Sequence, residues 1–205
     1  MENIRLTKGE LKKQRDYLRQ YERYLPTLQL KKQQLQLEIL RQMAVLEERR
    51  QGLVSKMKSA QAWLGLLAEG GIDLRPFLKA ERIITEVKNI AGADIPLFAR
   101  AEFAFAEYDL FTSPLWLDAA VESLRQILSL RQELRLLEKG IGILRQELRI
   151  TAQRVNLFEK VKIPAASQAI RLIKIYLGDQ MVNSVGRSKM AKNKIEEGIL
   201  TGVAA

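Results

Sequence analysis

Two long repeats of apolar residues constrain the fold of this chain more than any other feature. In the first third, positions spaced alternately by four and three residues run from Leu18 to Leu67, and eleven of these fifteen positions are apolar. A second series runs from Ile127 to Tyr176, with thirteen of fifteen positions apolar. Arg, Lys, Gln and Glu, which favour helix, lie between them. An apolar spacing of 3.5 sustained over this length is typical of a coiled coil.

Each helix predicted by these repeats is too long for a compact domain. A helix of about 60 residues is about 90 Å long, whereas a globule of 205 residues has a radius of gyration of about 17 Å. The helices must therefore pair along their length. The short connection favours an antiparallel hairpin within one chain, and a homodimer is the alternative. We expect a mainly α fold, a long antiparallel two-helix coiled-coil hairpin with a small β-hairpin-containing segment at its far end.

Local signals mark the ends of the two helices. Thr7 and the acidic residue three positions later form a capping-box pattern, so we expect the first helix to begin there. Ser113 or Pro114 opens the second helix, because proline is tolerated in a first turn. Gly178 predicts its end, with residues 189–197 as a further helical stretch.

Each repeat contains one proline, Pro26 in the first and Pro164 in the second. Proline inside a helix costs about 3 kcal/mol and bends it. If Leu67 lies opposite Ser123, an assumption about register, the two prolines fall opposite each other. We then expect both kinks at one level of the pair.

The middle of the chain has a different pattern. Residues 74–81 predict a short helix, and residues 82–87 and 96–105 predict strands around a turn at 91–94. A helix over the last part of this segment is the alternative. The sequence thus divides into an N-terminal long helix, a middle segment and a C-terminal long helix with a basic tail, covering residues 1–67, 68–116 and 117–205.

The positive charge is concentrated near the two termini. The chain has a net charge of +10, from 34 Lys and Arg against 24 Asp and Glu. An antiparallel hairpin places both termini at one end, so we expect a basic tip there that meets an acidic partner. Ordinary solvation of exposed helix faces is the alternative. The residues of this expected tip are Lys8, Lys12, Lys13, Arg15, Arg19, Arg187, Lys189, Lys192 and Lys194.

The composition argues against catalysis. The chain has no cysteine and no histidine, which excludes disulfides, thiol nucleophiles, imidazole catalysis and Cys/His metal sites. Phosphate-binding, dinucleotide-binding and nucleophile-elbow motifs are absent from the sequence. We expect no catalytic, cofactor-binding or metal-binding residue and no direct nucleotide. The start has no apolar signal core and no apolar run is long enough to span a membrane, so we expect a cytoplasmic location without membrane insertion.

One segment of the second helix resembles a known family. Residues 154–164 resemble the R-V-N-x-x-E-x-x-x-I-P stretch of the D subunit of V/A-type rotary ATPases. Shorter similarities lie in residues 89–96, 112–122 and 189–195. The residues that carry the main match are Arg154, Val155, Asn156, Glu159, Ile163 and Pro164.

This resemblance implies a non-catalytic central shaft. Members of the family project their terminal end into a ring of alternating catalytic A and B subunits, bind the small F subunit, and sit on the subunit that links them to the membrane rotor ring. On this view the basic tip faces the inner wall of the ring, and the complex lies against the membrane. Two other interpretations remain, a free-standing coiled-coil scaffold or adaptor and a basic nucleic-acid-binding hairpin. Against the latter, no aromatic stacking platform lies near the lysines.

Overall fold

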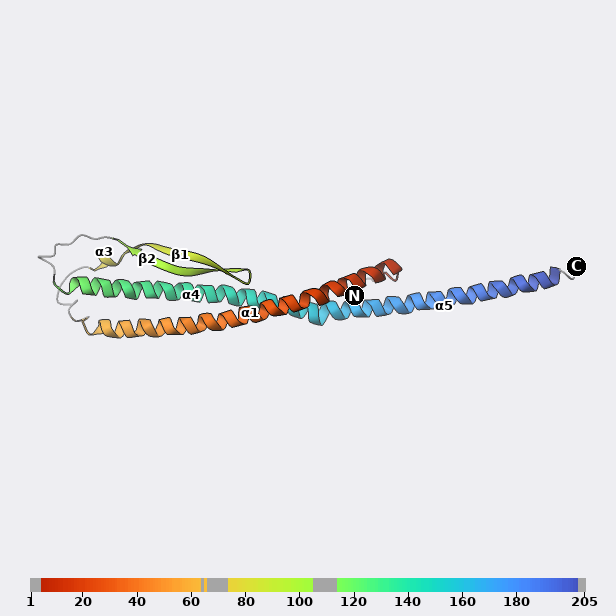
Figure 1. Cartoon of the computed structure of the whole chain (residues 1–205), viewed down its shortest axis with the longest axis horizontal. Coiled ribbons are helices and arrows are strands. Elements are labelled where there is room, and N and C mark those ends of the chain that lie inside the picture. The colour runs from red at the N-terminus through yellow and green to blue at the C-terminus, as the bar shows by residue number, and fades with distance from the viewer. Residues whose placement is uncertain (1–4, 64, 66–73, 105–113, 203–205) are drawn as a thin grey trace. The chain divides into compact units, whose positions relative to one another are not determined.

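The computed structural model describes residues 5–63, 65, 74–104 and 114–202. The described part of the chain is mainly helical and contains one antiparallel β-hairpin, which confirms the predicted fold class (Figure 1). The elements in chain order are α1 (Lys8–Gln61), α3 (Arg75–Leu78), β1 (Ala80–Ile90), β2 (Ala93–Phe103), α4 (Leu117–Leu157), a π-helical turn (Phe158–Lys162) and α5 (Ile163–Gly202).

The chain forms two compact units, which are described separately. Unit 1 contains Met1–Gln29 and Gln153–Ala205, and unit 2 contains Leu30–Ala152. In each unit, a stretch of α1 lies beside a stretch from the C-terminal half of the chain. Pairing is therefore intramolecular in both units.

In unit 2, α1 and α4 run antiparallel with their apolar seams facing each other. Lys31 donates to Glu147 over 2.8 Å, and Arg49 pairs with Glu133 at 3.0 Å. As the residue number rises along α1 it falls along α4, which confirms the predicted antiparallel hairpin. Between these ion pairs Leu35 is fully buried, as its position in the apolar repeat predicts.

The assumed register is wrong. It places Lys31 opposite Glu159 and Arg49 opposite Ile141, whereas the observed partners lie about two to three helical turns earlier in α4. In an apolar repeat, a shift by one heptad keeps every apolar position facing the partner helix, so the repeat alone fits several registers.

The prolines therefore do not share a level. In unit 1, the ring of Tyr21 contacts the ring of Phe158, with centroids 5.3 Å apart. Along the antiparallel pair, Pro26 lies on one side of this contact and Pro164 lies on the other. The predicted common kink is wrong for this reason.

The hairpin folds back along the helices of unit 2 (Figure 1). Its open end lies near the end of the helical pair, as predicted. Its turn end does not project away from the helices, because Ala93 and Ile95 of β2 pack into one buried cluster with Leu35, Ile39 and Leu144. The hairpin thus forms a third layer on the helical pair, and the most deeply buried leucines lie beneath it.

The turn of the hairpin has two residues, Ala91 and Gly92, with φ of 51° and 80°. Positive φ at both central positions matches the right-handed twist of the strands. Asn89 supports the turn, because its Oδ1 accepts from the Gly92 amide at 3.1 Å and its Nδ2 donates to Asp94 at 2.6 Å. The predicted turn is confirmed, and both strands are longer than expected.

The short helix before the hairpin ends earlier than predicted. It stops at Leu78, and Ala80 and Glu81, which were expected to be helical, already belong to β1. Lys79 has extended backbone angles and its carbonyl accepts from the Ala104 amide at 3.0 Å. Pairing at the open end of the hairpin therefore outweighs helix propensity here.

The starts of α1 and α4 lie close to the residues that the sequence predicted, whereas the end of α5 does not. The Thr7 hydroxyl accepts from the Glu10 amide at 3.2 Å, which confirms the N-terminal cap. Helix α4 begins at Leu117, not at Pro114, whose carbonyl accepts from the Leu117 amide at 3.0 Å. Ser113 lies outside the described residues. The predicted end at Gly178 is wrong, because α5 continues to Gly202.

The π turn shifts the apolar seam by one residue. The Ile163 amide donates to the Phe158 carbonyl, five residues earlier, so the turn accommodates one residue more than an α-helix. Before it, the predicted seam positions of α4 are buried or half-buried. From the turn onward, four of the five predicted positions are exposed, namely Lys162, Ala165, Leu172 and Tyr176. The covered positions there are Ile163, Ala166, Ala169, Ile170, Ile173 and Leu177.

Pro164 explains why the extra residue is tolerated at this place. A proline ring collides with the carbonyl four residues earlier in a regular α-helix. The wider π turn directly before Pro164 changes the path of that backbone. The local sequence and the position of the seam therefore favour the same irregularity.

Candidate interaction surfaces

Among the described residues, no group of three or more His, Cys, Asp or Glu could hold a metal ion. Thr151 is the one buried polar side chain in the described part of the chain. None of the described helices is both long and apolar enough to cross a membrane. The chemistry of this chain is therefore sought in its exposed charges and exposed apolar side chains.

The nine basic residues of the predicted tip are all exposed, but they form two groups. Five lie in the first turns of α1, and four lie on α5 beyond its covered part. Within the part of α5 whose burial the structure describes, up to Gly198, the last half-buried residue is Leu177, and every residue from Gly178 to Gly198 is exposed. Arg187 lies ten residues beyond Leu177, about 15 Å farther along the helix. The two groups are therefore separated along α5.

The C-terminal group lies on a helical stretch without intramolecular cover. Lys192 is paired with Glu196 at 3.6 Å, and Arg187 donates to the Asn183 carbonyl at 3.4 Å. Both interactions are local to α5. Met190 and Ile195 are more than 60% exposed among these charges.

The residues of the family-like motif surround the π turn. Val155 is buried and Ile163 is half-buried, so these two carry the apolar seam across the irregularity. Arg154, Glu159 and Pro164 are exposed, as is Asn156. The motif thus contains two residues that pack in the apolar seam and several that are exposed to solvent. Phe158 and Ile163 are successive residues of the covered seam and lie five positions apart instead of the usual three or four, and this spacing marks the turn.

Helix α5 also has an exposed apolar stripe on the side opposite its covered seam. Leu172, Ile175 and Val182 are all more than half exposed. Their spacing of three and seven residues keeps them on one side of the helix. Leu172 is a residue that the apolar repeat predicted to be internal.

Arg125 connects α4 to the open end of the hairpin. Its Nε donates to the Phe77 carbonyl and its Nη2 to the Ala104 carbonyl, both at 3.0 Å, and its guanidinium lies 5.5 Å from the centroid of the Phe103 ring. A guanidinium suits this arrangement, because its fork places two donors at fixed positions.

Replacing Arg125 with lysine is expected to lower the stability of the hairpin by about 1.5–3 kcal/mol, because an ammonium cannot reproduce both hydrogen bonds and the ring contact. Hydrogen exchange of the β1 and β2 amides measures the effect. Arg131→Lys, at an exposed position of α4, is the matched control. Equal exchange in the two variants would contradict the prediction.

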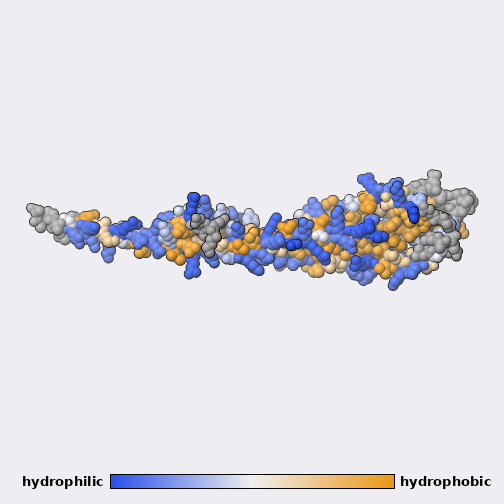
Figure 2. All heavy atoms as spheres, turned by 180° about the vertical axis from the view of Figure 1, so that it is seen from behind, coloured by the Kyte–Doolittle hydropathy of each residue, from blue (hydrophilic) through white to orange (hydrophobic). Residues whose placement is uncertain are grey.

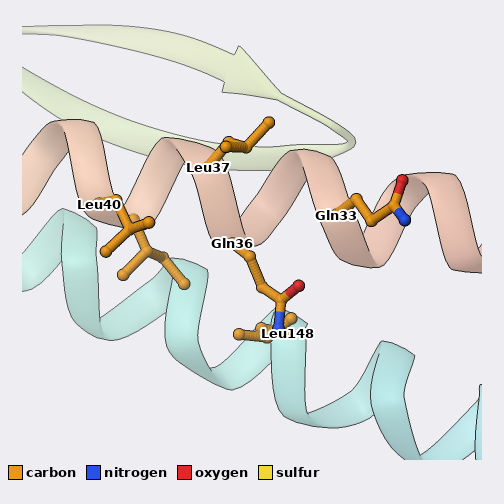
Figure 3. A pocket seen from close by; sticks show the side chains of 6 residues that line it. Gln33, Gln36, Leu37, Leu40 and Leu148 are labelled. Carbon is orange, nitrogen blue, oxygen red and sulfur yellow. The ribbon is translucent and has the colours of Figure 1, made fainter.

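A groove between α1 and α4 in unit 2 is a surface that the apolar repeats did not predict. Its volume is about 630 Å³, and it is lined by Gln33, Gln36, Leu37, Ile39, Leu40 and Leu148. Figure 3 shows Gln36 and Leu40 reaching from α1 toward α4, with Leu148 beside the Gln36 amide. Leu37 and Leu40 are 59% and 64% exposed. They lie outside the seam, which is why the repeat did not identify them.

Hydrophobic and charged side chains alternate over the visible face of unit 2 (Figure 2). Large exposed apolar side chains are more informative than exposed charges, because they are costly to leave in water. The groove and the α5 stripe are therefore the apolar surfaces that are the best candidates for binding a partner.

Comparison with known proteins identifies the family of this chain. The model of the family described as the D subunit of ATP synthase matches residues 10–193. The chain belongs to the family of ATP synthase D subunits. The V-type ATP synthase D subunit of Borreliella burgdorferi is 40% identical over 195 residues, covering 95% of this chain and 96% of that protein.

More distant ATP synthase D subunits give the same result. The V-type ATP synthase D subunit of Chlamydia trachomatis is 32% identical over 202 residues, with 95% of this chain and 97% of that protein covered. The protein of the same name from Chlamydia pneumoniae is 30% identical, with 94% and 93% covered. The resemblance inferred from residues 154–164 is thereby confirmed for nearly the whole chain.

Proposed function

We propose that this chain is the central rotor shaft of a V-type rotary ATP synthase, a non-catalytic subunit that couples ATP hydrolysis or synthesis to rotation and ion transport. The observation that carries the proposal is the antiparallel pairing of α1 with the C-terminal helices in both units, in which the two apolar repeats face each other. Interlocking side chains along a helical pair resist bending and twisting. Such resistance is what a shaft requires.

The proposed partners are a hexameric ring of catalytic A and B subunits, the F subunit, and the subunit that links the shaft to the membrane rotor ring. The complex would lie on the cytoplasmic face of the membrane, and the chain itself would bind no nucleotide, nucleic acid or cofactor. The exposed basic residues near both termini would face the ring, where charge complementarity guides assembly. Family membership supports this assignment of partners.

A single-molecule experiment tests the rotor proposal. Because the sequence has no cysteine, Val87→Cys gives one unique attachment point at a residue of β1 that is 72% exposed. The ring of A and B subunits is immobilised with this variant assembled in it, and a bead is attached to the new thiol. The bead is expected to rotate when ATP is added. A complex that hydrolyses ATP while the bead stays still would overturn the proposal.

Neutralising the basic residues near the termini is expected to weaken binding to the ring by about tenfold or more and to flatten its salt dependence. Because the lysines form two groups, each group is changed to glutamine separately and then both together. Binding of each variant to immobilised ring is measured at low and high salt. The lysines to be replaced are Lys8, Lys12, Lys13, Lys189, Lys192 and Lys194.

The control removes the same amount of exposed charge from unit 2. It changes to glutamine Lys58, Arg82, Lys88, Arg131, Arg135 and Lys139, all of which are exposed. If both sets of substitutions weaken binding equally, net charge explains the effect and the terminal lysines have no special role. Salt-dependent binding to RNA or DNA, lost in the same variants, would favour the nucleic-acid alternative.

A further inference from the structure

We propose that the groove between α1 and α4 of unit 2 binds an amphipathic helix with acidic edges from another subunit of the same complex. The inference rests on membership of the family of ATP synthase D subunits and does not require that the chain rotates.

The first argument is the apolar surface left open in the groove. Leu37 and Leu40 are largely exposed, although Ile39 between them is buried. Leu148 of α4 closes the other side. Side chains one helical turn apart on α1 thus give a groove that runs along the helix axis, and such grooves accept the apolar face of another helix.

The second argument is the charge along the groove. Lys32 lies one turn before Gln36 on α1, and Arg145 and Arg149 flank Leu148 on α4. Arg145 reaches from α4 to α1, with its Nη2 3.5 Å from the sulfur of Met43. Among the described residues, none of these three cations forms an ion pair.

The neighbouring carboxylates do not neutralise this rim. Glu147 accepts from Lys31 at 2.8 Å. Glu38 accepts from Gln42 at 2.9 Å and lies 3.7 Å from Arg41. Both carboxylates are therefore engaged by other groups, and the rim keeps its positive charge.

An acidic amphipathic helix fits these features better than the other occupants. A second copy of this chain, docked groove to groove, would bring like charges together, which is unfavourable. A nucleic acid would match the charge, but an aliphatic floor of leucines offers no aromatic ring on which bases could stack. A helix with leucine-sized residues on one face and Asp or Glu along its edges satisfies both the floor and the rim.

Cross-linking in the assembled complex identifies the occupant. A photoreactive phenylalanine derivative replaces Leu40 in the full chain, the complex is assembled with all its subunits, and the linked peptide is sequenced by mass spectrometry. The expected product is a peptide of another subunit with apolar residues spaced by three and four and with carboxylates beside them. A link to a second copy of this chain, to nucleic acid or to a peptide without carboxylates overturns the proposal, as does the absence of any link.

Binding measurements test the energetic contribution. The variant L37Q/L40Q is expected to weaken retention of the linked subunit at least about tenfold. The variant K32Q/R145Q/R149Q should weaken it and reduce its salt sensitivity. These residues are exposed or half-buried, so the fold should be retained, which circular dichroism verifies.

The control L172Q/I175Q removes two equally exposed apolar residues from α5 and should leave retention of that subunit unchanged. If all variants retain the subunit as the parent chain does, the groove is not its binding site. Such a result would overturn the groove proposal and leave the rotor proposal untouched, because bead rotation is measured independently.

Discussion

Replacing Leu144 with alanine is expected to lower the free energy of unfolding of unit 2 by about 2–5 kcal/mol. Leu144 is fully buried and packs with Leu35 of α1 and Ile95 of β2. Its side chain therefore contacts all three layers of the unit. Truncation leaves a cavity that these layers cannot all close at once, so both the helical pair and the docking of the hairpin should weaken.

Thermal unfolding and native-state hydrogen exchange measure this effect. The matched control is Leu30→Ala, at a position of α1 that is 55% exposed, where the change should stay within about 0.5 kcal/mol. The exchange of β2 amides should increase in the Leu144 variant and stay the same in the control. Similar stability of the two variants would show that the cluster beneath the hairpin is not the core of this unit.

Deleting Gln168 is expected to destabilise unit 1 by about 3 kcal/mol or more. Gln168 is exposed, so its own contacts matter little. If the π turn stays, the deletion rotates Ile170 and Ile173 out of the seam. If the π turn is lost instead, those residues stay covered, but Pro164 then lies in a regular helix at a cost of about 3 kcal/mol.

A matched deletion separates these two effects. Removing Lys162, also exposed, removes the surplus residue of the π turn itself. Combined with Pro164→Ala, it should give a regular helix with Ile163 still on the seam, and with stability close to that of the parent chain. Hydrogen exchange of residues 163–177 compares the variants. If the deletion of Gln168 and the deletion of Lys162 combined with Pro164→Ala lower stability equally, the seam after the π turn contributes little to the stability of unit 1.

Much of the fold could be predicted from the spacing of apolar residues, because burial of one helix face requires that spacing. The register could not, since a coiled-coil seam looks the same after a shift of one heptad. Specific pairs such as Lys31 with Glu147 distinguish the registers, and they are recognisable only once both helices are in place. The hairpin was predicted from its turn residues, whereas its docking on Leu35 depends on tertiary packing.

The candidate surfaces divide in the same way. Eight of the nine basic residues were expected in helices, whereas Arg187 was expected between the predicted helix end and the next helical stretch; all nine are helical and exposed. Whether they form one group depends on where the C-terminal helix ends. Glycine at position 178 disfavours helix by about 1 kcal/mol relative to alanine, which is too little to end α5. The groove was missed because Leu37 and Leu40 lie outside the repeat, and nothing in a single helix indicates what faces such residues.

The one surplus residue between Phe158 and Ile163 has an effect well beyond its own turn. It rotates the following helix by roughly the angle of one residue, about 100°. Leu172 and Tyr176, which an unbroken repeat would turn inward, are instead directed outward. One additional residue thus gives the terminal helix two apolar sides, one that packs against its own chain and one that is exposed for contact with another molecule.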